Sequence, residues 1–166
     1  MTTTQEPNAV SAASVPGDEA RRAGQDRTLA AMHELEVALG SAAPGREPSW
    51  RADVLAALVA LDDATHDEHA NAMRVDSLWA DIKRTQPRLR TRVRGLRSHY
   101  GQLRQAIAAI RDEIARPDDN TDFADIRQRL AWVLTALRHQ RARESDLIYE
   151  AYYDAYDAEL GRDRAL

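Results

Sequence analysis

The sequence predicts an all-α protein, an antiparallel up-down four-helix bundle, and three observations lead to this fold class. Apolar residues recur at steps of three and four along four long stretches of the chain. Segments rich in proline, glycine and short polar residues separate these stretches, and no segment shows a sustained strand alternation. Because the connections are short or of modest length, we expect consecutive helices to run antiparallel.

The first two helices are predicted over about residues 18–39 and 48–73. The segment SAAPGREP forms the turn between them, and Pro48 suits the first turn of a helix because its missing N–H needs no partner there. Each helix has one apolar face, which is formed by Leu29, Met32, Leu35 and Leu39 in the first and by Trp50, Val54, Leu58 and Leu61 in the second.

The last two helices follow a connection at residues 74–86, in which Leu78 and Trp79 are expected to pack back on the bundle. The third helix begins after Pro87, and Asp122 or Thr121 can cap the fourth, which continues to about residue 160. Their apolar stripes are Leu89, Val93, Leu96, Tyr100, Leu103, Ile107, Ile110 and Ile114 in the third helix and Phe123, Ile126, Leu130, Val133 and Leu137 in the fourth.

The chain length fits one domain, with the bundle over residues 18–161 and tails at residues 1–17 and 162–166. The first segment has neither the basic start nor the apolar run of a signal peptide or a membrane span, so we expect a cytoplasmic protein with no membrane partner. A net charge of −4 argues against nucleic-acid binding as the main task. The absence of cysteine leaves nitrogen and oxygen as the ligands of any metal.

Histidines fall one or two to a helix, and this distribution indicates a metal site inside the bundle. His99 lies at the predicted level of residue 138, so it can share a site with His139. The apolar stripe of the fourth helix continues through Gln140 and Glu144, and a buried carboxylate is costly unless it is paired, hydrogen-bonded or bound to a cation. Glu144 is therefore the strongest single ligand candidate.

The first two helices offer further nitrogen and oxygen ligands. His66 and His69 lie on one face of the second helix with Asp62 one turn earlier, and His33 lies beside Glu36 on the first. Histidine and carboxylate at helical spacing are what a di-iron or di-manganese bundle uses. The alternative for each histidine is a hydrogen-bonded residue at the edge of an apolar stripe.

Several stretches resemble the hemerythrin-like superfamily, also described as histidine–histidine–glutamate cation-binding domains, and its bacterial members in particular. They are MHELEVAL, PGREPSW, THDEH, PRLRTRVRGLRSHYGQL and LRHQRARESDLIYEAYYDAYDAELG, and they span about residues 26–161. The resemblance implies a four-helix bundle with a non-haem di-iron centre that serves oxygen or nitric-oxide binding or sensing, or iron handling.

The resemblance transfers to single residues only in part. It matches His33, His99 and the pair His139 and Glu144, whereas the second helix lacks the expected glutamate four residues after a histidine. Ala70 follows His66 at that spacing, and Met73 follows His69. A mononuclear iron site and a lost site are therefore both alternatives to the di-iron centre.

Two functions from different classes follow. The first is an iron-binding protein, rather than a turnover enzyme, whose iron is held by ligands from His33, His69, His99, His139 and Glu144 and responds to O2, NO or iron. The second is a metal-free interaction or regulatory module with a protein partner or a second copy of itself. It would use the arginine-rich start of the third helix or the tyrosine-rich segment YEAYYDAY at 149–156.

Overall fold

The computed structural model describes residues 17–41, 45–116 and 121–163, with side chains as far as Tyr153, and these residues form helices and no strand. The all-α class is therefore confirmed. The remaining parts of the predicted tails, residues 1–16 and 164–166, lie outside the described residues. The elements are α1 (Asp18–Gly40), α2 (Glu47–Ala72), α3 (Leu78–Thr85), the 3₁₀ turn η1 (Pro87–Leu89), α4 (Arg90–Ala115) and α5 (Phe123–Asp163).

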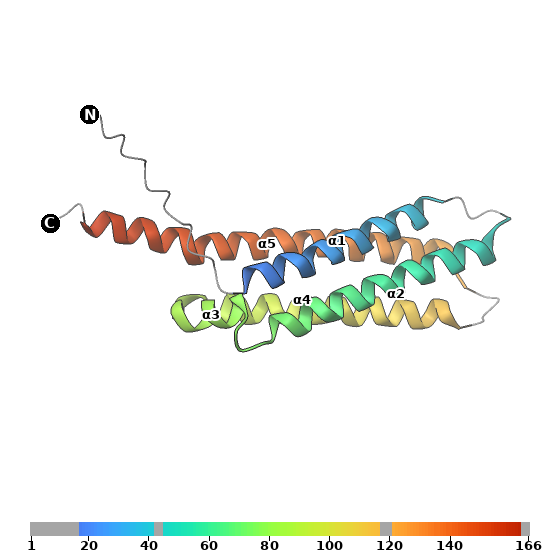
Figure 1. Ribbon diagram of the computed structural model, residues 1–166. Coiled ribbons are helices and arrows are strands. Elements are labelled where there is room, and N and C mark those ends of the chain that lie inside the picture. Colours follow the sequence, from blue (N-terminus) through green and yellow to red (C-terminus); the bar gives the residue numbers. More distant parts are fainter. Residues whose placement is uncertain (1–16, 42–44, 117–120, 164–166) are drawn as a thin grey trace, which may run out of the picture.

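Four long helices lie alongside one another, and the short α3 lies at one end, beside the start of α4 (Figure 1). Helix α1 packs against α2, α2 against α4, and α4 against α5. Side chains also join the first helix to the last. Arg138 of α5 forms an ion pair with Glu36 of α1, and the Arg141 guanidinium donates to the carbonyl oxygen of Gln25 at 3.2 Å.

Side-chain caps explain where two of the helices, α5 and α3, begin. The carboxylate Oδ1 of Asp122 accepts hydrogen bonds from the backbone N–H groups of Ala124 and Asp125, at 3.0 and 3.1 Å, so the predicted cap of α5 is confirmed. The Ser77 hydroxyl oxygen accepts from the N–H of Ala80 at 3.2 Å and caps α3 in the same way. These caps use N–H groups that have no partner within the helix.

The connection predicted at residues 74–86 contains the additional helix α3. Its eight residues give too short a periodic pattern for a helix to be distinguished from a loop. The packing prediction for this segment is confirmed, because Leu78 and Trp79 are buried. Two smaller expectations were wrong: α5 continues to Asp163, past the predicted end at about residue 160, and Leu29, expected on the apolar face of α1, is 47% exposed.

The apolar core consists of two clusters of buried residues. The larger cluster lies among α1, α2, the second half of α4 and the first half of α5, from Tyr100 to Ile114 on α4 and from Ile126 to Leu137 on α5. The smaller cluster joins α3 and the start of α4 to Leu147 and Ala151 of α5. None of the helices that the structure describes is long and apolar enough to cross a membrane.

Candidate functional site

Buried polar side chains separate the two apolar clusters. They come from four helices, and each is at most 8% exposed: Thr28 on α1, Glu68 on α2, Tyr100 on α4, and Gln140 and Glu144 on α5. We call these five residues the polar layer. The predicted inward register of Gln140 and Glu144 is confirmed, because both are almost fully buried. Buried polar groups are retained only where hydrogen bonds replace the water that they lose, so the partners of each one matter.

Glu68 is the carboxylate of the polar layer with the most hydrogen bonds. Its Oε2 accepts from the Thr28 hydroxyl at 2.7 Å and from the Tyr100 hydroxyl at 3.0 Å. The Arg141 guanidinium lies 3.5 Å from the same oxygen and supplies the opposite charge. The buried position and the neighbouring Glu68 carboxylate raise the pKa of Tyr100, so this hydroxyl stays protonated and keeps donating.

Glu144 is buried more deeply than Glu68 and has fewer partners. Its Oε1 accepts from the Gln140 side-chain amide at 2.8 Å, and that amide also donates to the Leu96 carbonyl oxygen at 3.0 Å. No hydrogen bond from a described residue reaches the other carboxylate oxygen of Glu144. Burial raises the pKa of Glu144, because little water remains to stabilise its charge. This carboxylate therefore has unused acceptor capacity.

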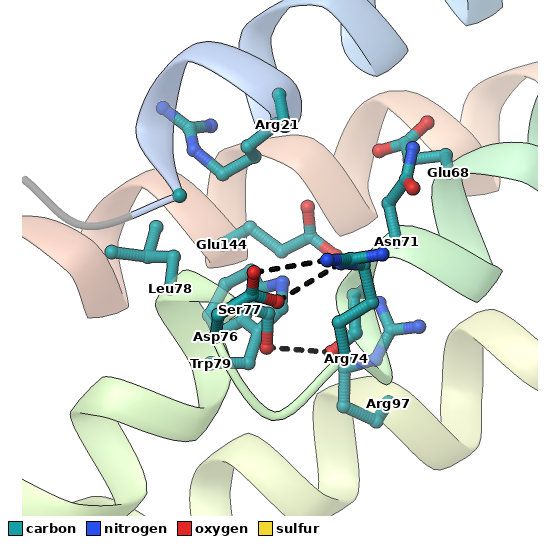
Figure 2. A pocket seen from close by; sticks show the side chains of 13 residues that line it. Arg21, Glu68, Asn71, Arg74, Asp76, Ser77, Leu78, Trp79, Arg97 and Glu144 are labelled. Atoms are coloured by element: carbon teal, nitrogen blue, oxygen red, sulfur yellow. Dashed lines mark hydrogen bonds and ion pairs between the residues drawn. The ribbon is translucent and has the colours of Figure 1, made fainter.

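A cavity of about 260 Å³ opens beside Glu68 and Glu144, where α1, α2, α3, α4 and α5 all contribute side chains (Figure 2). Part of its wall is apolar and is formed by Ala20, Ala72, Leu78 and Trp79. In Figure 2 the Glu144 side chain extends from α5 into the middle of the lining residues. Enclosed sites with an apolar wall and a few polar groups are typical of small-molecule binding.

Three arginines also line the cavity, and they differ in what they bind. Two are paired with nearby acids, Arg21 with Asp18 at 2.7 Å and Arg74 with Asp76 at 2.9 Å. The third is Arg97 of α4, which forms no ion pair with a described residue. Its Nη2 donates to His69, and its buried Nε has no hydrogen-bond partner. Arg97 therefore complements Glu144, since one needs an acceptor and the other a donor.

The structure places four of the eight predicted metal ligands beside arginines of a neighbouring helix. His69 Nδ1 accepts from Arg97 Nη2 at 2.7 Å, and His66 Nδ1 accepts from Arg104 Nη2 at 2.9 Å. Two of the three predicted carboxylates are ion-paired in the same manner, Asp62 with Arg111 and Glu36 with Arg138. An arginine thus takes up one ring nitrogen or one carboxylate oxygen of each of these groups and places a positive charge beside it, where a metal cation would be repelled.

The remaining histidines lie at the surface. His33 is exposed on α1, away from the polar layer. His99 and His139 line one open groove between α4 and α5, so the structure brings this predicted pair together. The groove does not include Glu144, which lines the cavity. Among the residues that the structure describes, no group of three or more histidine, aspartate or glutamate side chains is arranged to hold a metal ion.

Glu68 is a site residue that the sequence analysis missed. The apolar stripe of α2 runs through Val54, Leu58 and Leu61, and its next steps of four and three reach Thr65 and Glu68, both buried. The same reasoning that singled out Glu144 on α5 would have found Glu68. Arg97 gave no such signal, because it lies in an arginine-rich segment whose members look alike in the sequence.

The chain was compared with known proteins in three ways. No protein-family model, no curated protein and no solved structure matches it. The functional argument therefore rests on the geometry of the cavity and of the surface.

Proposed function

We propose that this chain is a ligand-binding helical module that works without a resident metal, and that its cavity takes a small zwitterion of the α-amino-acid class. One observation carries the proposal. Glu144 is 3% exposed, lines a cavity of about 260 Å³, and has Gln140 as its only hydrogen-bond donor among the described residues. A ligand ammonium group would supply the missing donors and add its charge to that of Arg97 and Arg141, which already act on this carboxylate.

The second polar end of the ligand follows from Arg97. This guanidinium lines the same cavity without an ion pair, and the partners of Arg21 and Arg74 are already in place. A ligand carboxylate would complement Arg97, and guanidinium groups bind carboxylates well because of their planar geometry. A ligand with both charges also leaves the total charge of the site unchanged, which reduces the cost of burying either one.

The rest of the cavity favours a ligand with a small apolar part. Leu78 and Trp79 are buried and belong to the smaller apolar cluster, so they offer a rigid wall for an alkyl or aromatic side chain. The volume of about 260 Å³ is below the range common for drug-sized ligands. An amino acid with an apolar side chain matches both the wall and the size.

The arrangement of the long helices supports an up-down four-helix bundle, the fold that the resemblance to hemerythrin-like domains implies. We propose that the chain has this bundle without the iron site of that superfamily. The support is that His66, His69, Asp62 and Glu36 are bonded to arginines, and that Glu144 lines a different hollow from His99 and His139. The module would report ligand binding to a partner, as the metal-free alternative expects.

Ligand binding is tested by thermal shift and calorimetry with the twenty amino acids. An apolar amino acid should raise the melting temperature, whereas its amine and its carboxylic acid, each carrying one charge, should act much more weakly. Glu144→Gln keeps the contact with Gln140 and should weaken binding by about 10–100-fold, the loss of one or two charge-assisted hydrogen bonds. Because burial raises the pKa of Glu144, binding should strengthen as pH rises through that pKa.

Two controls separate this result from general effects. Asp146→Asn makes the same chemical change two residues further along α5 at an exposed position, and it should leave binding intact. Ala72→Leu fills the cavity without changing a charge, and it should abolish binding. If no amino acid binds, or if Glu144→Gln binds like the unmodified chain, the proposal is wrong.

The iron-binding alternative needs a separate measurement. The protein purified without an affinity metal is analysed for metal content and is then exposed anaerobically to ferrous iron. We expect no stoichiometric uptake. One or two irons per chain, lost in His99→Ala, would instead favour the hemerythrin-like function.

A further inference from the structure

The groove between α4 and α5 is independent of the cavity and has different chemistry. It has a volume of about 510 Å³ and is lined by His99 of α4 and, on α5, by Trp132, His139 and Arg143 with small residues such as Ala136 and Ala142 between them. On α5 the larger residues and Ala136 recur at steps of four, three and four, so they form one stripe. The stripe from Trp132 to Arg143 is about 16 Å long at 1.5 Å per residue.

The ionisable residues of this groove are all basic. His99, His139 and Arg143 line it, and no acidic residue does. Among the described residues, none of the three has a hydrogen bond or an ion pair. Asp146 lines an adjacent hollow together with Arg143 and Arg92, but it does not line the groove. The groove therefore presents unpaired donors and positive charge to whatever binds there.

Trp132 adds an apolar contact at one end of the groove. Its side chain is 59% exposed, whereas Trp50 and Trp79 are buried in the two apolar clusters. Tryptophan and arginine are enriched at the centres of protein interfaces, where the indole supplies apolar area and the guanidinium binds carboxylates. An exposed tryptophan about three helical turns from an unpaired arginine is a combination that fits a binding surface.

From these features we propose that the groove is a docking surface for an acidic peptide segment of a partner protein. An apolar side chain of that segment would lie on Trp132, and its carboxylates would face His139 and Arg143. The open, elongated shape suits an extended or helical peptide, because small molecules are held in more enclosed sites. Trp132 is the one tryptophan, tyrosine or phenylalanine in the lining of this groove, so successive bases would find a single stacking platform, which makes nucleic acid a poorer match.

The test is to select, from a display library of random dodecapeptides, those that bind the intact chain. The affinities of the enriched peptides are then measured at two salt concentrations. We expect sequences with several acidic residues around one apolar residue, and weaker binding at higher salt. Trp132→Ala and Arg143→Gln should each weaken binding at least fivefold. Arg94→Gln is the matched control, since Arg94 is exposed on α4 outside the groove, and it should bind like the unmodified chain.

Three results would overturn the proposal. The first is that no peptide, or only peptides without acidic residues, are enriched. The second is that Arg94→Gln weakens binding as much as Arg143→Gln, which would indicate general charge attraction. The third is that a double-stranded oligonucleotide binds more tightly than the peptides and loses affinity in the same variants, which would assign the groove to nucleic acid. Circular dichroism of each variant verifies that it is folded.

Discussion

At the scale of single residues, the two buried glutamates have different roles because their partners differ. Glu68 accepts from Thr28, Tyr100 and Arg141, residues of three other helices, and so joins those helices at one point. Glu144 accepts from Gln140 on its own helix and faces the cavity. We therefore expect substitutions of Glu68 to affect folding and substitutions of Glu144 to affect ligand binding.

The stabilising role of Glu68 predicts a large effect of its removal. Glu68→Ala removes the acceptor of the buried Tyr100 hydroxyl, one acceptor of Thr28 and the opposite charge beside Arg141, so the free energy of unfolding should fall by about 3–5 kcal/mol. Tyr100→Phe removes one hydrogen bond and should cost about 1–2 kcal/mol. Asp67→Ala, at the exposed neighbouring position, should change stability by less than about 0.5 kcal/mol. Urea unfolding measures all three, and equal effects at Glu68 and Asp67 would contradict the assigned role.

The lowered pKa of His69 predicts how the stability of the fold depends on pH. Burial, followed by the positive charges of Arg97 and Arg104 and by His66, lowers the pKa of His69 below its ordinary value. The unfolded chain therefore takes up this proton at a higher pH than the folded chain. Stability should be complete above about pH 6.5 and should fall as the pH is lowered from there.

His69→Gln tests this dependence, because glutamine does not titrate. The stability curve of the variant, measured by urea unfolding between pH 5 and 8, should be flatter than that of the unmodified chain. His33→Gln at an exposed position of α1 serves as the control and should leave the slope unchanged. An equal slope in the unmodified chain and in His69→Gln would assign the pH dependence to other groups.

At the scale of the elements, the start of α1 meets the start of α3 at Gly17. Among the glycines that the structure describes, Gly17 has the closest neighbouring backbone. Gly17 precedes α1 with a φ of 70°, in the left-handed region that favours glycine. A Cβ atom there would lie 2.9 Å from the backbone nitrogen of Leu78. The position of α3, and with it part of the cavity wall, therefore depends on a residue without a side chain.

Two glycine substitutions are expected to change the free energy of unfolding in opposite directions, one at this contact and one at an open position of α4. Gly17→Ala should lower the free energy of unfolding by about 1–3 kcal/mol, because of backbone strain and the close approach to Leu78. Gly101→Ala should raise it by about 0.5–1 kcal/mol, since a Cβ at this position of α4 meets no atom within 4 Å and alanine favours the helix. Thermal and urea unfolding measure both, and a neutral Gly17→Ala would show that the junction adapts.

At the scale of the whole molecule, the polar layer divides the apolar core into unequal parts. The larger cluster contains buried residues of four helices, while the smaller one consists of α3, the start of α4 and a short part of α5. Regions with less buried apolar surface open at lower free energy. We therefore expect the end of the molecule that carries α3 to open locally before the rest.

Hydrogen exchange followed by mass spectrometry tests this order. Amides of Leu78–Thr85 should exchange faster than those of α2 and of the second half of α4. Leu78→Ala should accelerate exchange in α3 and the start of α4 while leaving the larger cluster protected, provided that the protein remains folded. Uniform acceleration across all helices would mean that the two clusters unfold as one cooperative unit.

The sequence by itself determined the all-α class, the approximate bounds of the four long helices and the inward face of α4. All eight residues of the stripe from Leu89 to Ile114 are buried as predicted. This works because the spacing of apolar residues along one helix is a local property of the chain. The inward positions of Gln140 and Glu144 followed from the same periodicity.

Only the tertiary structure decided what each polar side chain contacts. Arg97 and His69 are 28 residues apart, and Arg138 and Glu36 are 102 apart, so no local pattern indicates that they pair. Histidine and carboxylate spacing is the same whether a metal or an arginine of the facing helix is the partner. Which partner a histidine or carboxylate has depends on how the helices meet in space. For the same reason, only the tertiary structure showed the cavity at Glu144 and the basic groove at Arg143.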